Sequence, residues 1–434
     1  MTPNVLREPP APAPAPMPNP LPLSDRAARL AAAGGTGATD VLVAARALEA
    51  AGRRVVHLEV GEPDAPTPPH VVEAGVRALR DGLTRYGPPA GIPELRAAAA
   101  ESLRARGVPA EPARMLIAPG ARALIFSTLL AVVRPGDEVL VPDPGYGAYA
   151  AVAEFAGGRA VRYPLDAGRD FIVDPDEVAA RVTARTRVLV LNAPHNPTGG
   201  VIDAPTLGRL AELARRHDLL VVSDEIYARH LYPDGPAAAG HPSAAHPSVA
   251  GLPGMAERTV VVDGVSKAYA MTGWRLGYAA LPAALVAPVT ALLAQSATCT
   301  ATFVQHAGVA ALAGPQDSVA AQVAELRHRR DWLVAALNRV AGVRCALPRG
   351  AFYVFPRVAG ALAGTGHTAE TLARRLLQDY GVACVPGPAF GPGGAGHLRF
   401  AYTASSDDLA VAVDALGACV AELRGRVADG AVEA

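Results

Sequence analysis

Residues 259–278 read TVVVDGVSKAYAMTGWRLGY, and this stretch decides the fold. Its first residues, 259–263, are dominated by valine and predict a short buried strand. Lys267 follows this strand closely, and Arg275 comes eight residues later. Loops at the carboxyl ends of buried parallel strands are where α/β proteins bind their ligands. We therefore expect the loop that carries Lys267 to contribute to a functional site.

Lys267 is the only lysine in the chain, since 39 of the 40 basic side chains are arginines. Arginine cannot form an imine, because its guanidinium stays protonated and delocalised. If the protein carries out Schiff-base chemistry, Lys267 is the one side chain that can do so. An imine-forming amine near a guanidinium that can hold a phosphate suggests a pyridoxal phosphate site. The alternative is a lysine and an arginine that share a solvated loop.

The surrounding region alternates short apolar runs with runs of helical periodicity. Predicted strands are 138–142, 187–192, 219–223 and 259–263, and predicted helices are 122–133, 204–217 and 283–295. Continuous apolar strands separated by helices predict an α/β fold, with a mostly parallel sheet covered by helices on both faces. A charged helix at 320–340, the segment GAFYVFP, another helix and HLRFAYT then predict a smaller α+β domain.

The expected organisation has four parts. Residues 1–23 are rich in proline and alanine and lack the apolar run of a signal peptide, so a disordered extension is expected. Residues 24–57 are expected to pack with the smaller domain. Residues 58–325 are expected to form the large cofactor-binding domain, and residues 326–434 the small C-terminal domain.

The composition excludes several classes of protein. The 434 residues carry 40 basic and 40 acidic side chains, so no basic excess is present to neutralise a nucleic acid backbone. The longest apolar stretch, 281–294, is broken by Pro282 and Pro288, so no membrane span is expected. Four scattered cysteines without a CxxC pair argue against a disulfide framework or a metal site and favour a reducing cytoplasm.

Further polar residues follow the other predicted strands. Asp224 ends the strand 219–223, and Tyr227 lies three residues later. A carboxylate beneath a pyridine ring would keep the ring nitrogen protonated and make the ring an electron sink. The alternative is an aspartate that caps a following helix. Asn196 lies in the rigid turn NAPHNPTGG, where its amide is placed to donate to a ligand oxygen.

Three more segments carry candidate binding residues. Gly120, Ala121 and Arg122 open the helix predicted at 122–133, and free N–H groups at a helix N-terminus suit a phosphate. Tyr146 follows the strand 138–142, where its ring could stack on a flat cofactor. Arg399 lies in an apolar segment, where it is expected either to grip a substrate carboxylate or to pair with an internal acid.

Together these segments resemble the class I/II aminotransferases of the aspartate aminotransferase superfamily, which have pyridoxal phosphate fold type I. The matching segments are GEPD (61–64), YGPPAGIPELR (86–96), PGAR (119–122), DPGY (143–146), NAPHNPTG (192–199), SDEIY (223–227), GVSKAYAMTGWRLGY (264–278), GAFYVFP (350–356) and LRFAY (398–402). No single short motif is specific, but nine in register are. The resemblance covers the chain from about residue 35 to its end.

The resemblance implies a role for each matching residue. Lys267 is expected to bind pyridoxal phosphate covalently and to move a proton between the substrate Cα and the cofactor, while Asp224 pairs the pyridine nitrogen. Asn196 and Tyr227 are expected to contact the ring oxygen, and Tyr146 the ring face. The phosphate is expected to be held by the backbone of Ala121 and Arg122 and the side chain of Arg275, together with Gly120 and Ser266, while Tyr86 reaches a neighbouring subunit's phosphate. Arg399, with Gly61, is expected to bind the substrate carboxylate. Tyr146 and Asn196 are also expected to touch the substrate. A homodimer with shared sites is implied.

The chain departs from the family pattern at three positions. Gly264 stands three residues before the lysine, where the family often has a phosphate-binding serine. Ala65 follows GEPD, where an aromatic residue commonly closes over the substrate. Arg122 occupies a place often held by Lys, Gln or Ser. We therefore expect one phosphate contact to be missing and the closure over the substrate to differ.

The implied activity is transfer of the amino group of an L-amino acid, of aspartate, alanine or aromatic type, to a 2-oxo acid with ping-pong kinetics. A β-lyase or an α-oxidase on the same scaffold would share Lys267 and Asp224, so the motifs leave these reactions open. A regulator with an aminotransferase-like domain would need a DNA-binding domain, and the roughly sixty residues before Gly61 contain no basic recognition helix. A cytoplasmic location is expected.

Overall fold

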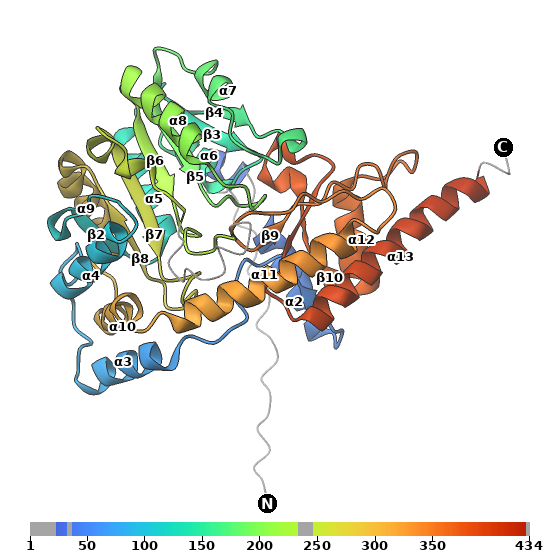
Figure 1. The fold of residues 1–434 in the computed structure, drawn as a ribbon, viewed down its shortest axis with the longest axis horizontal. Coiled ribbons are helices and arrows are strands. Elements are labelled where there is room, and N and C mark those ends of the chain that lie inside the picture. Colours follow the sequence, from blue (N-terminus) through green and yellow to red (C-terminus); the bar gives the residue numbers. More distant parts are fainter. Residues whose placement is uncertain (1–22, 33–36, 233–245, 431–434) are drawn as a thin grey trace, which may run out of the picture.

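The computed structural model describes residues 23–32, 37–232 and 246–430. Nearly all of the predicted Pro/Ala-rich extension therefore lies outside the described residues. The larger part of the described chain is built on a seven-stranded sheet, in the order β2-β8-β7-β6-β5-β3-β4 (Figure 1). The strands are β2 (Met115–Ala118), β3 (Glu138–Asp143), β4 (Arg159–Pro164), β5 (Thr186–Asn192), β6 (Leu220–Asp224), β7 (Thr259–Gly264) and β8 (Gly277–Ala280).

All neighbouring strands in this sheet are parallel except where β8 pairs with β2 and β7. The prediction of a mostly parallel sheet is therefore confirmed, and the four predicted strands correspond to β3, β5, β6 and β7. Strand β8 was not predicted, because its sequence GYAA contains no β-branched residue. Gly277 is needed there, since a Cβ atom at this position would lie 2.4 Å from the backbone nitrogen of Ala121.

Helices cover both faces of the sheet, because successive strand residues point in opposite directions. Val260 and Val262 of β7 pack against one group of helices, and Val261 packs on the other face. The first face is covered by α5 (Ala121–Val132), α6 (Ala148–Phe155) and α9 (Ala283–Ala297). The second is covered by α3 (Pro69–Arg80), α4 (Pro93–Arg104), α7 (Pro175–Ala179), α8 (Ala204–Arg216) and α10 (Thr302–Ala313).

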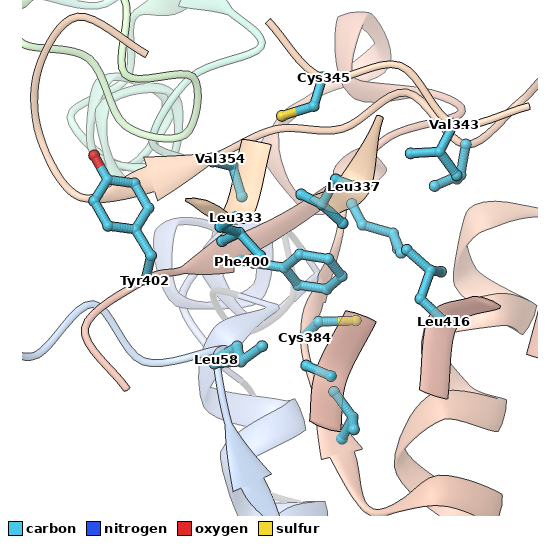
Figure 2. Packing of buried hydrophobic residues seen from close by; sticks show 14 of the residues in the cluster. Leu58, Leu333, Leu337, Val343, Cys345, Val354, Cys384, Phe400, Tyr402 and Leu416 are labelled. Carbon is cyan, nitrogen blue, oxygen red and sulfur yellow. The ribbon is translucent and has the colours of Figure 1, made fainter. Parts of the chain in front are cut away.

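The smaller part has its own core, built from short strands and long helices. Strands β9 (Tyr353–Val354), β11 (Val385–Pro386) and β12 (Leu398–Ala401) form one sheet, and β1 (Val56–His57) pairs with β10 (Val382–Ala383). The helices are α11 (Asp317–Leu337), α12 (Ala369–Tyr380) and α13 (Ser406–Gly430). Figure 2 shows Leu333 and Leu337 of α11 near Phe400 of β12 in this core.

The first helices contact different parts of the molecule. Helix α1 (Asp25–Ala32) lies against α6 of the large sheet, whereas α2 (Ala38–Ala50) lies against β10 of the smaller part. Among the described residues, no helix is long and apolar enough to cross a membrane. The beginning of α2 and the ends of β5, β6 and β7 meet at the same place, and the site described next lies there.

Candidate active site

A pocket of about 390 Å³ lies between the carboxyl ends of the large-sheet strands and strand β12 of the smaller part. It brings together eleven of the thirteen residues that the sequence nominated: Gly61, Ala121, Arg122, Tyr146, Asn196, Asp224, Tyr227, Ser266, Lys267, Arg275 and Arg399. The two that do not line it are Gly120 and Tyr86. Segments that are distant in the sequence therefore form one site.

Lys267 points into this pocket from the loop after β7. Its Nζ donates a hydrogen bond of 2.5 Å to the backbone oxygen of Gly61. Burial lowers the pKa of Lys267 to about 8, although the nearby carboxylate of Glu62 opposes this effect. A lysine with a lowered pKa is partly neutral near neutral pH, so it can act as a nucleophile and as a base.

Asp224 lies at the end of β6 and is 5% exposed. Its Oδ2 accepts a hydrogen bond of 2.6 Å from Tyr149, and the backbone N–H of Ile226 donates to Oδ1 at 3.3 Å. Burial raises the pKa of Asp224 to about 6, while the bond from Tyr149 acts in the opposite direction. A turn rather than a helix follows Asp224, so the helix-capping alternative is wrong.

Tyr149 is a site residue that the sequence reasoning missed. It lies in the first turn of α6, three residues after Tyr146, and the two ring centroids are 5.4 Å apart at an angle of 84°. The spacing of the two tyrosines in DPGYGAY was the available signal, because side chains three residues apart at a helix start share a face.

Arg399 is almost completely buried on β12, with its guanidinium near the rings of Tyr353 (4.6 Å) and Phe390 (5.0 Å). Nη1 donates to Oδ1 of Asn196 at 3.2 Å, and Nη2 donates to the backbone oxygen of Glu59. Its Nε is buried without a partner. No carboxylate of the described residues is within ion-pair distance of Arg399, so the internal-acid alternative is not supported.

Two hydroxyls meet beside this arginine. The Tyr227 and Tyr353 oxygens are 2.7 Å apart, and both side chains are buried. Tyr353 belongs to GAFYVFP but was not nominated as a site residue. A Cβ atom at Gly61 would lie 1.8 Å from the Tyr353 oxygen. Glycine at position 61 is therefore required by the approach of Tyr353.

The opposite end of the pocket is formed by the N-terminus of α5. Gly120 precedes the helix with a φ of 90°, and a Cβ atom there would lie 2.5 Å from Nη2 of Arg275. The Arg275 guanidinium thus lies next to the free N–H groups of the first helical turn. This combination of a cation and helix N–H groups is suited to a phosphate.

Packing explains one of the departures from the family pattern. A Cβ atom at Gly264 would lie 3.0 Å from the backbone oxygen of Leu276 and 3.1 Å from Ile226. A serine at this position would therefore have to displace its neighbours.

At the pocket, Arg122 is exposed and its guanidinium is 5.4 Å from the centroid of the Tyr146 ring. Tyr86 is 87% exposed.

Comparisons with known proteins agree with this geometry. Residues 53–416 match the family model for aminotransferase class I and II. The chain is 40% identical over 381 residues to a bifunctional aspartate aminotransferase and glutamate/aspartate-prephenate aminotransferase of Petunia hybrida, covering 85% of this chain and 77% of that protein. An aspartate aminotransferase of Pyrococcus abyssi is 38% identical, over 83% of this chain and 90% of the relative.

The same likeness is found among solved structures. The aspartate aminotransferase of Thermus thermophilus with maleate superposes with a TM-score of 0.83 at 37% identity, covering 92% of this chain and 100% of that chain. An aromatic aminotransferase from Pyrococcus horikoshii gives a TM-score of 0.79 at 37% identity, over 85% of this chain and 96% of that chain.

Proposed function

The chain belongs to the class I and II aminotransferases, which are transferases dependent on pyridoxal phosphate, and from this premise we propose how its residues move the amino group of an amino acid to a 2-oxo acid. The observation that supports the proposal best is that the chain's only lysine lies in one pocket with Asp224 and Arg399.

The residues of the pocket fit the cofactor at each of its polar ends. The side chain of Arg275 and the N-terminus of α5 would hold its phosphate, and Gly120 leaves the room that Arg275 occupies. Asp224 would hold its ring nitrogen, and Asn196 with Tyr227 its ring oxygen. The amine of Lys267 would hold its aldehyde carbon covalently. When bound, pyridoxal phosphate supplies an electron sink for the bond broken at the substrate Cα.

Two side chains control the protons of the reaction. The Lys267 amine, with its pKa lowered to about 8 by burial, takes the proton from the substrate Cα as a general base. Asp224 holds a proton at the ring nitrogen, because a buried carboxylate stabilises a cation beside it. The hydrogen bond from Tyr149 fixes Oδ2 of Asp224.

The substrate is oriented by Arg399, whose buried Nε has no partner and which forms no ion pair among the described residues, so its guanidinium can bind an α-carboxylate. We propose an acidic amino acid as the preferred donor, with Arg122 binding the distal carboxylate. Arg122 is exposed in the pocket and has no ion pair among the described residues. Similar proteins named aspartate aminotransferase, one of them solved with the dicarboxylate maleate, support this choice.

We propose a homodimer in which Tyr86 reaches the neighbouring subunit's phosphate site. Tyr86 lies between α3 and α4, is exposed, and is not part of the pocket of its own chain. We also propose the division into residues 58–325 and 326–434, with 24–57 as the N-terminal segment. One core cluster lies entirely before residue 325, and most of another lies after it, although Tyr227 and Tyr232 pack in the second. Four free cysteines support the proposed cytoplasmic location.

A panel of amino donors with 2-oxoglutarate, oxaloacetate and pyruvate tests the proposal. We expect aspartate to be the best donor, and release of one 2-oxo acid per site when no acceptor is present. Release of ammonia at each turnover, without formation of a new amino acid, would instead indicate a lyase or an oxidase. Sedimentation of the purified protein tests the dimer, and a Tyr86→Phe variant tests the shared site through its cofactor dissociation constant.

A further inference from the structure

Three charged side chains form a buried cluster behind the cofactor pocket. Arg106 follows α4, Glu225 follows β6, and Asp263 lies on β7. Nη1 of Arg106 donates to Oδ2 of Asp263 at 2.8 Å, and Nη2 donates to Oε2 of Glu225. The side chains are 4%, 6% and 2% exposed for Arg106, Asp263 and Glu225. A buried cluster of this kind has a large effect on the charges near it.

The two carboxylates are held firmly by neutral donors as well. The hydroxyls of Ser223 and Ser248 donate to Oε1 of Glu225 at 2.8 and 2.6 Å. Asp263 accepts from the Tyr278 hydroxyl at 3.1 Å and from the N–H of Gly264 at 2.7 Å. Both carboxylates therefore accept hydrogen bonds from neutral donors as well as from Arg106. Burial raises the pKa of Asp263, and the charge of Arg106 acts against this effect. The cluster contains two carboxylates and one guanidinium.

Asp224 adjoins this cluster across the sheet. Glu225 is the next residue along the chain, and Val262, which precedes Asp263, is the register partner of Asp224. Asp224 shares the face of Val222 and Tyr149, while Asp263 shares the opposite face with Val261. Three buried carboxylates thus lie together, and Arg106 pairs with the two that do not face the pocket.

We propose that Arg106 is a positioning residue for the cofactor's ring nitrogen: by neutralising Glu225 and Asp263 from behind the sheet, it keeps Asp224 ionised. This inference rests on the proposed role of Asp224. Glu225 and Asp263 both raise the pKa of Asp224, after the larger effect of burial. Without Arg106, the charge of the two carboxylates would be compensated only in part, by Arg229, which also acts on Asp263. The proton would then move from the ring nitrogen towards the Asp224 carboxylate.

Other groups also act on Asp224, and they remain unchanged in the variants below. They are Tyr146 and Tyr149 on the α6 side, Tyr227 after β6, Tyr353 of β9 and Lys267 after β7. Arg106 could instead have a purely structural role and hold the end of α4 to the sheet. Its loss would then weaken cofactor binding as a whole, whether or not the cofactor has a ring nitrogen.

The test uses two probes, pyridoxal phosphate and its deaza analogue, in which CH replaces the ring nitrogen. Both are bound to the full chain stripped of cofactor, and the ratio of their dissociation constants measures the contribution of the ring nitrogen. In Arg106→Met we expect the preference for pyridoxal phosphate to fall at least tenfold at pH 7. In the triple variant Arg106→Met/Glu225→Gln/Asp263→Asn, which removes all three charges, we expect it to return to within threefold of wild type.

Arg104→Met is the matched control, because Arg104 lies two residues before Arg106 and binds the exposed Glu101. The single variant Glu225→Gln keeps the shape and removes one negative charge, so the pH midpoint of the preference should move below the wild-type value. In Arg106→Met it should move above that value. The proposal would be overturned if Arg106→Met weakened the binding of both probes equally. It would also be overturned if the pH midpoints of Arg106→Met and Glu225→Gln moved in the same direction. If Asp224→Asn loses the preference for pyridoxal phosphate but Arg106→Met keeps it, the role of Asp224 stands and the proposal for Arg106 fails. If Asp224→Asn keeps the preference, the proposed role of Asp224 itself fails.

Discussion

The Tyr149 hydroxyl donates a hydrogen bond of 2.6 Å to Oδ2 of Asp224, and both side chains are buried. This bond opposes burial, which raises the pKa of Asp224 to about 6. The carboxylate proposed to hold the ring nitrogen therefore has a neutral donor on its pocket face that favours its charged form. Behind the sheet, Glu225 and Asp263 act in the opposite direction, and Arg106 pairs with both of them.

Removing the hydroxyl in Tyr149→Phe should raise the pKa of Asp224. A hydrogen bond to a charged group contributes about 1.5–3 kcal/mol, so the acid limb of the kcat/KM profile should move up by roughly one to two pH units. Activity at pH 9 should change much less. The comparison variant Asp224→Asn removes the charge at every pH and should cost on the order of 4 kcal/mol in the transition state. An unshifted acid limb in Tyr149→Phe would contradict this prediction.

Lys267→Ala should abolish covalent attachment of the cofactor, because no second lysine is present in the chain. Borohydride reduction followed by peptide mapping should find the reduced adduct on Lys267 in wild type and nowhere in the variant. The Asp224→Asn protein is the control, since its amine is intact and should still be labelled. Turnover in Lys267→Ala, or an adduct on another peptide, is the contrary result.

Much of this site followed from residues that the strands themselves position. Asp224 comes directly after an apolar run, and Asn196 lies in the turn after another, at Thr186–Asn192. The structure brings both to one pocket. Lys267 could be nominated because it is the only lysine. Each of these residues is placed by local structure, and the parallel sheet then brings their strand ends together.

The residues that were missed depend on partners that are distant in the sequence. Tyr353 meets Tyr227 across 126 positions, and Arg106 meets Asp263 across 157. No local periodicity indicates such pairs. Strand β8 was missed for a different reason: its small residues have weak strand propensity, but close packing against α5 requires them.

Replacing Gly264 with the serine that the family often has should not improve phosphate binding. The added Cβ would lie 3.0 Å from the backbone oxygen of Leu276 and 3.2 Å from Cα of Gly277, so the two strands would have to separate. Overpacking of this kind costs about 1–3 kcal/mol. Thermal unfolding of the cofactor-free protein should show the loss in Gly264→Ser. A matched Gly208→Ser change on α8, where a Cβ meets nothing within 4 Å, should have little effect. Unchanged stability of Gly264→Ser would show that the strands can adjust.

His57 should contribute to stability in a pH-dependent way. Its Nδ1 is 2.7 Å from Oε1 of the fully buried Glu59, and its Nε2 is 3.1 Å from Oε1 of Glu49. Burial alone would lower the pKa of His57, but these two carboxylates outweigh it and raise the pKa. The stabilisation by charged His57 is therefore complete below its unfolded-state pKa and is lost as the pH rises through the folded-state value.

The measurement is the free energy of unfolding of wild type and His57→Gln by denaturant. The difference should be roughly 1 kcal/mol larger at pH 6 than at pH 9, since glutamine keeps a donor but not the charge. His217→Gln, at the end of α8, serves as the control. A difference that grows with pH would show that neutral His57 is the stabilising form.

Substrate choice should depend on Arg122. Its guanidinium is exposed in the pocket near the ring of Tyr146, and it has no ion pair among the described residues. If Arg122 binds a distal carboxylate, Arg122→Gln should lower the ratio of kcat/KM for aspartate to that for alanine by about 1.5–3 kcal/mol, the value of a charged hydrogen bond. The rate with alanine should change little, because alanine has no distal group to bind.

Arg399→Lys provides the comparison that separates distal from α-carboxylate binding. Lysine keeps the charge but loses the two-pronged guanidinium, so both substrates should lose kcat/KM and their ratio should stay near the wild-type value. Arg122→Gln should change the ratio of kcat/KM for aspartate to that for alanine, whereas Arg399→Lys should lower both values together. An unchanged ratio in Arg122→Gln would show that Arg122 does not bind the distal carboxylate. The acidic preference would then have to come from another cation. Mixed dimers in which the inactive Lys267→Ala subunit also carries an arginine substitution would show whether the neighbouring subunit of the proposed dimer supplies it.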